Sequence, residues 1–162
     1  MTMNPASLVR ARDSLVPALL NGLINGAIAY ASFRSTASVP LSLDLISARQ
    51  HTVWGQGVTL AFALGVILSL VTAKIFARHV VKSHPELGPL VDRPMVPWLL
   101  RVSLGNAVFL FGWFVALAVL WQRAVGTVEV GPVAASALVG ALAAVITVLV
   151  EVRTKRAMLR PG

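Results

Sequence analysis

The sequence contains no cysteine and very few acidic residues. Its 162 residues include six Asp and Glu, 14 Lys and Arg, and three histidines. Without cysteine, the chain cannot form disulfide bonds, carry out thiol redox catalysis or bind a metal through thiolates. Charged residues make up only 12% of the chain, about half the share of an average soluble domain. Such scarcity, beside a hydrophobic share of 57%, is typical of a protein that lies largely in an apolar environment.

Four segments are long and apolar enough to cross a bilayer. Backbone N–H and C=O groups find no water inside a bilayer, so each span must form a helix that satisfies its own hydrogen bonds. None of the four shows the alternation of a barrel strand. The sequence therefore predicts an all-α membrane protein, a four-helix transmembrane bundle over residues 15–152. Its spans are about 15–33, 57–77, 98–121 and 133–152, between an N-terminal segment (1–14) and a basic tail (153–162).

We expect the first span to be retained, because it is longer than the apolar part of a signal peptide and carries two asparagines. Lys and Arg residues then distribute unevenly between the two sides. Eleven lie in segments on the side of the N-terminus and three on the other side. This asymmetry predicts an inner-membrane protein with both termini in the cytoplasm. It also argues against nucleic-acid binding as the reason for the net charge of +8.

Polar residues lie within the predicted spans. Asn21 and Asn25 are four residues apart, so they share one helix face. An amide facing lipid costs free energy, so both must face protein or a wet cavity. They either hydrogen-bond between helices or line a polar path, and the first interpretation is favoured. The polar intramembrane cluster considered for such a path is Asn21, Asn25, Asn106, Ser103, Thr59 and Thr72.

Small residues recur at four-residue spacing in three spans. Such stripes let membrane helices approach closely. The stripes of the second and fourth spans match each other, and Asn25–Tyr30 aligns with Asn106–Phe111, a pattern that points to two tandem helical hairpins. We expect the second and fourth helices to make the closest contact. The predicted helix-packing residues are Gly22, Gly26, Gly65, Ser69, Ser136, Gly140 and Ala144.

Catalytic and cofactor-binding patterns are scarce. No span carries a carboxylate or lysine at its centre, which disfavours proton-coupled transport. No span carries a histidine either, so a haem held across the bundle is not expected. We predict no cofactor and no metal site.

Two charged clusters lie outside the spans. One, on the outer side, consists of Arg34, Asp44, Arg49 and His51. It either pins the loop through an ion pair, which is favoured, or offers an outer-face anion or headgroup site. Surface acid–base chemistry at His51 and Asp44 is a remote third option. The other cluster is basic, and its predicted partners are anionic lipid headgroups on the cytoplasmic side. Its residues are Lys74, Arg78, Lys82, Arg153, Lys155 and Arg156.

Three classes of function fit these patterns. A non-catalytic membrane subunit or helix-packing interaction protein agrees best with the small-residue stripes and the uncharged spans. A self-assembling passive channel or small-solute permease is the alternative, supported by the amides and the possible repeat. An outer-face enzyme comes last. The sequence thus predicts a homo-oligomer or a place in a larger membrane complex.

Overall fold

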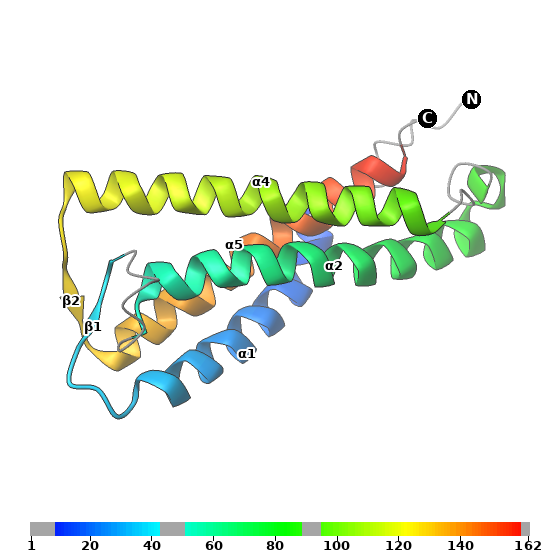
Figure 1. Ribbon diagram of the computed structural model, residues 1–162. Helices are drawn as coiled ribbons and strands as arrows, with labels where there is room; N and C mark the ends of the chain where they lie inside the picture. The colour runs from blue at the N-terminus through cyan, green and yellow to red at the C-terminus, as the bar shows by residue number, and fades with distance from the viewer. Residues whose placement is uncertain (1–8, 43–50, 89–94, 160–162) are drawn as a thin grey trace.

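The structure is a computed structural model that describes residues 9–42, 51–88 and 95–159. Asp44 and Arg49, two residues of the predicted outer cluster, lie outside the described residues. Four long helices make up most of the described chain (Figure 1). They are α1 (Leu15–Phe33), α2 (Val53–Ser83), α4 (Met95–Ala124) and α5 (Pro132–Met158).

All four helices are long and apolar enough to cross a membrane, which confirms the predicted all-α four-helix bundle. Three of them extend beyond their predicted spans. The second span was expected at 57–77, whereas α2 begins at Val53 and ends at Ser83. The additional turns carry Arg78 and Lys82, as a helix that continues past the apolar layer would. Helix α5 likewise continues through Arg153 and Arg156 to Met158.

The helix ends follow ordinary capping chemistry. Thr52 precedes α2, and its side-chain oxygen accepts a hydrogen bond from the Gly55 N–H at 3.0 Å. This bond satisfies one of the N–H groups that a first turn leaves without a partner. Pro132 occupies the first turn of α5, where a missing N–H costs nothing. The 3-10 helices η2 (Ala11–Ser14) and η3 (Pro85–Leu87) precede α1 and follow α2.

The packing order of the helices does not follow the chain order. Helix α1 lies along α5, helix α4 lies along α2, and α2 also packs against α5 (Figure 1). Consecutive helices of the two predicted hairpins therefore make few of the main contacts. Instead, α1 of the first hairpin packs on α5 of the second, and α4 of the second packs on α2 of the first. The buried core between α2, α4 and α5 consists of Val58, Ala61, Leu64, Leu110, Phe114, Ala143, Ile146 and Val150.

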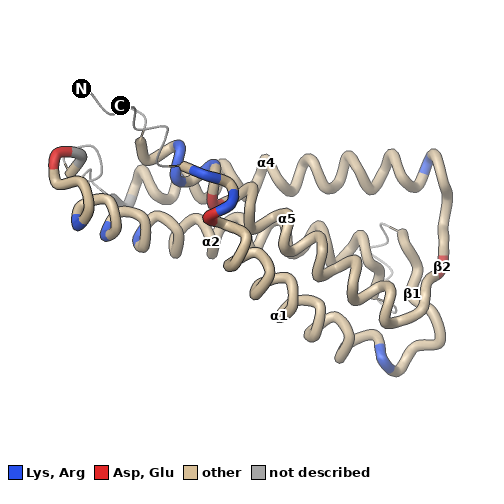
Figure 2. The backbone as a smooth tube through the Cα atoms, turned by 180° about the vertical axis from the view of Figure 1, so that it is seen from behind, with Lys and Arg blue, Asp and Glu red and all other residues tan. Residues whose placement is uncertain are grey.

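A short antiparallel ribbon closes one end of the bundle, which we call the loop end. Strand β1 (Val39–Pro40) pairs with β2 (Glu129–Val130), with Val39 opposite Val130. The Leu41 N–H adds a hydrogen bond to the Val128 carbonyl at 2.7 Å. This ribbon joins the two connections that follow α1 and α4. The opposite end, where α1 begins and α5 ends, carries most of the Lys and Arg residues and is called the basic end (Figure 2).

The small-residue stripes pack closely, but not with the expected partners. A Cβ placed on Gly65 of α2 would lie 2.6 Å from the Ala107 Cα of α4. One placed on Gly140 of α5 would lie 2.8 Å from the Gly22 carbonyl oxygen of α1. The expectation that α2 and α5 make the closest contact is therefore wrong, although these two helices also pack against each other. Larger buried side chains, including Leu64 of α2 and Ile146 of α5, belong to the core cluster that α2, α4 and α5 share.

Candidate functional site

A buried amide joins three helices near the basic end. Asn106 of α4 is 4% exposed. Its Nδ2 donates to the Ser69 Oγ of α2 at 2.9 Å and to the Thr154 Oγ1 of α5 at 3.1 Å. Ser69 in turn donates to the Gly65 carbonyl at 2.6 Å. Because every polar atom of the amide is used, Asn106 fixes how the three helices dock.

The same amide holds an arginine. Arg153 Nε donates to Asn106 Oδ1 at 3.0 Å, and the Arg153 guanidinium lies 3.9 Å from the centre of the Phe109 ring. A cation over an aromatic face is attracted by the ring quadrupole. These two contacts orient the guanidinium, although Arg153 as a residue is exposed. An oriented arginine is a pre-organised donor for an anion.

Arg153 lines a cleft between α4 and α5. The cleft has a volume of about 450 Å³ and contains three arginines. Within the described residues, no carboxylate lies at ion-pair distance from these arginines. We call it the arginine cleft, and its lining residues are Trp98, Arg101, Val102, Gly105, Asn106, Arg153, Arg156 and Ala157.

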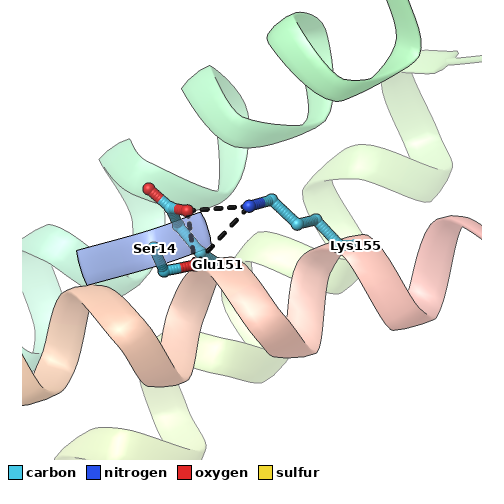
Figure 3. A network of polar contacts seen from close by, with 3 residues as sticks. All are labelled: Ser14, Glu151 and Lys155. Carbon is cyan, nitrogen blue, oxygen red and sulfur yellow. Dashed lines mark hydrogen bonds and ion pairs between the residues drawn. The ribbon is translucent and has the colours of Figure 1, made fainter. Parts of the chain in front are cut away.

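Lys155 differs from its basic neighbours because it has an acidic partner. Lys155 Nζ lies 2.9 Å from Glu151 Oε2, and Ser14 Oγ donates to the same oxygen at 2.7 Å (Figure 3). The two charged side chains are only 15% and 10% exposed. The charge of Lys155 is thus neutralised inside the protein, whereas it was predicted to contact lipid headgroups. The remaining predicted headgroup residues are exposed: Lys74, Arg78, Lys82, Arg153 and Arg156.

The asparagines of the first helix belong to a separate contact. Asn21 Nδ2 donates to the Thr147 Oγ1 of α5 at 2.7 Å. Asn25 Nδ2 donates to the Asn21 carbonyl and to Asn21 Oδ1, both at 2.9 Å. Asn21 therefore joins α1 to α5, and Asn25 supports Asn21. Asn106 hydrogen-bonds with other residues, so the three amides do not form one constellation.

The hydroxyl residues of the predicted polar cluster form no hydrogen bonds with its amides among the described residues. Thr59 is exposed on α2 and donates to the Gly55 carbonyl of its own helix at 3.0 Å. Thr72 is buried at 7% exposure. Ser103 is 1% exposed, and its Oγ has no hydrogen-bond partner among the described residues. The structure thus brings only Asn106 of this set to the arginine cleft.

Of the four charged residues of the predicted outer cluster, the structure describes two. Arg34 follows α1 and His51 precedes α2, and both are exposed. Asp44 and Arg49 lie outside the described residues. Among the residues that the structure describes, no three His, Asp or Glu side chains come together as metal ligands.

A second surface depression lies between α1 and α5. It has a volume of about 540 Å³ and an almost wholly apolar lining. Its floor consists of small residues, so the backbones of α1 and α5 are close to the surface there. The predicted packing residues Gly22, Gly26, Ser136, Gly140 and Ala144 all line it.

Sequence reasoning did not single out several residues that hold these contacts. Thr147 accepts a hydrogen bond from Asn21, and Thr154 accepts one from Asn106. Ser14 donates a hydrogen bond to Glu151. The spacing of Glu151 and Lys155, four residues apart on one helix, was a signal for their pair. Thr154 and Ser14 gave no such signal, because their partners are far away in the chain.

Together, the fold and these contacts define a small helical membrane protein with a largely apolar interior, one buried ion pair between Glu151 and Lys155, and a basic end. Among known families, curated proteins and solved structures, none matches this chain.

Proposed function

We propose that this protein is a non-catalytic subunit of a larger membrane assembly, placed in the cytoplasmic membrane with both termini in the cytoplasm. The orientation is supported by the asymmetry of Lys and Arg, because positively charged loops stay on the cytoplasmic side. In this orientation the basic end faces the cytoplasm.

The observation that carries the proposal is the way the intramembrane amides are used. Asn21 and Asn106 each donate to a hydroxyl of another helix. A path for solutes needs polar groups that remain free to contact the solute, as a catalytic site needs them free for a substrate. Amides bonded between helices serve to specify packing. Amides that are already bonded within the chain therefore favour a non-catalytic packing role over a conducting one.

Native mass spectrometry of the protein, extracted gently from its own membrane, tests the subunit role. We expect this chain to appear together with a different membrane chain. A single copy alone would contradict the proposal. A mass of several copies of this chain would also contradict it and would favour the self-assembling passive channel.

A flux measurement separates the two roles further. We expect vesicles that contain the protein to take up glycerol no faster than protein-free vesicles. The Asn106→Leu variant should lower the thermal stability without changing flux, because it removes a bond between helices. Thr59→Val is the matched control, since Thr59 bonds only within α2. Flux that exceeds the protein-free rate and falls in Asn106→Leu would refute the packing role.

A further inference from the structure

We propose that the arginine cleft binds a phosphate group. The inference is independent of the subunit role and rests on the basic end of the bundle. A phosphate group can reach the cleft as the headgroup of an anionic lipid or as a soluble phosphate compound. The chemistry of recognition is the same in both cases.

Among the described residues, no carboxylate compensates the charge in the cleft. Arg101 of α4 and Arg153 and Arg156 of α5 line it from two sides. Glu151 of α5, an acidic residue near this end of the bundle, is already bonded to Lys155 and Ser14. Three cations of like sign repel one another, so a bound anion lowers their free energy. Because Glu151 is paired with Lys155, the three arginines depend on a bound anion to balance their charge.

The central arginine is already oriented for such a ligand. The bond from Arg153 Nε to Asn106 Oδ1 and the contact with Phe109 hold its guanidinium in place. Asn106 itself is fixed by Ser69 and Thr154. The guanidinium N–H fork matches the oxygens of phosphate, and a fixed fork loses little entropy on binding. Among the described residues, Arg153 donates a hydrogen bond through Nε alone, so its terminal nitrogens are available to an anion.

The shape of the cleft fits a headgroup with an apolar continuation. Its volume of about 450 Å³ falls within the range of about 300–1,000 Å³ of ligand sites. Trp98, Val102 and Ala157 supply apolar surface next to the arginines. Gly105 leaves one wall open, since a Cβ built on it meets no atom within 4 Å. A side chain at this position can therefore fill the cleft without a clash in the fold.

Two substitutions on α4 test the cleft directly. Gly105→Leu places a side chain in the cleft. Gly112→Leu is the matched control, because Gly112 lies on the same helix, also has open space at its Cβ and does not line the cleft. We expect the phosphate group to bind at least roughly tenfold more weakly in Gly105→Leu, because the leucine keeps it from the hydrogen bonds to charged groups that dominate such sites. Phosphate binding should be unchanged in Gly112→Leu.

A second pair of variants separates a site from a merely basic surface. Arg101→Gln with Arg156→Gln removes two charges from the cleft. Lys74→Gln with Arg78→Gln removes two exposed charges from α2 that do not line it. General attraction to anionic headgroups would make the two doubles equally weak. We expect strong loss only in the Arg101/Arg156 double variant.

The full-length chain is tested with two probes. In the lipid arm, native mass spectrometry measures which lipid remains bound from a mixture of phosphatidylglycerol and phosphatidylcholine. In the soluble arm, glycerol 3-phosphate is titrated against the thermal stability of the protein in phosphatidylcholine nanodiscs. Retained phosphatidylglycerol that is lost in Gly105→Leu supports a lipid phosphate. Stabilisation by glycerol 3-phosphate that is lost in Gly105→Leu supports a soluble source. If neither probe distinguishes wild type from Gly105→Leu, the proposal is overturned.

Discussion

At the scale of single residues, the buried pair of Glu151 and Lys155 is the contact most sensitive to substitution. Taking two charges out of water is costly, and only their mutual attraction and additional hydrogen bonds offset that cost. Here Ser14 supplies the additional bond, at 2.7 Å from Glu151 Oε2. Removal of either charge leaves the other buried without its partner.

We expect Glu151→Gln to lower the free energy of unfolding by about 3 kcal/mol, in the range seen when one partner of a buried ion pair is removed. Thermal unfolding in detergent measures the change. The double variant Glu151→Gln with Lys155→Met should recover most of the loss, because no unpaired charge remains. A single variant as stable as wild type would show that the pair is not buried in the membrane-embedded protein.

The two asparagines of α1 should respond differently to substitution, although they share one face. Asn21 bonds to Thr147 of α5, whereas Asn25 bonds only to Asn21. We expect Asn21→Leu to lower the unfolding free energy by about 0.6–1.7 kcal/mol, as for other bonds between membrane helices. Asn25→Leu should cost less. Equal losses in denaturation curves of the two variants would contradict this assignment.

At the scale of the helix, close approach at small residues determines which helices pair. Gly65 allows α2 to approach Ala107 of α4, and Gly140 allows α5 to approach Gly22 of α1. Because lipid tails are as apolar as leucine side chains, membrane helices gain mainly from van der Waals contact at short distance. A stripe in the sequence predicts that a close contact exists. It does not predict the partner, since every stripe of small residues is compatible with every other.

Gly65→Ala should therefore destabilise the bundle by about 1–3 kcal/mol, the usual cost of overpacking. The added Cβ would lie 2.6 Å from the Ala107 Cα, a backbone atom that cannot move aside alone. Gly112→Ala is the control, because its Cβ meets nothing within 4 Å. It should keep or raise stability, since Ala forms helices better than Gly. The midpoints of denaturation of the two variants provide the comparison.

At the scale of the whole molecule, the two hairpins interlock. Helix α1 packs along α5, and α4 packs along α2. The sequence alignment pairs Gly26 with Ala107 and Gly65 with Gly140. In the structure Gly65 contacts Ala107, and Gly140 lies close to Gly26. Corresponding residues of the two aligned halves thus make corresponding contacts, and the duplication of a helical hairpin stays a prediction.

Interlocking predicts that the halves hold together without a covalent link. Co-expressed fragments 1–88 and 95–162 should copurify, because the main contacts of α1 and α4 lie in the opposite fragment. Each fragment alone should be degraded or aggregate, since its own two helices share few contacts. Fragments that fold separately and do not copurify would show that each hairpin is an independent unit.

Much of this protein could be predicted from the sequence by itself. The length and apolarity of the four spans define four helices, because a backbone inside a bilayer has few other ways to satisfy its hydrogen bonds. The sequence also indicates that Asn21 and Asn106 must face protein, since an amide in contact with lipid is costly. The sequence also shows the basic residues beyond the spans, and their uneven distribution between the two sides predicts the orientation in the membrane.

Only the tertiary structure decided which side chains meet. Asn106 and Arg153 are 47 residues apart, and nothing local to either residue encodes their bond or the position of Phe109 under the guanidinium. The arginine cleft exists because α4 and α5 supply arginines to one hollow in which Gly105 of α4 places no side chain. The charge of Lys155 is neutralised because Ser14 and Glu151 lie next to it. Periodicity selects the face that a helix buries. The neighbour that covers this face depends on packing among all four helices, which no single span contains.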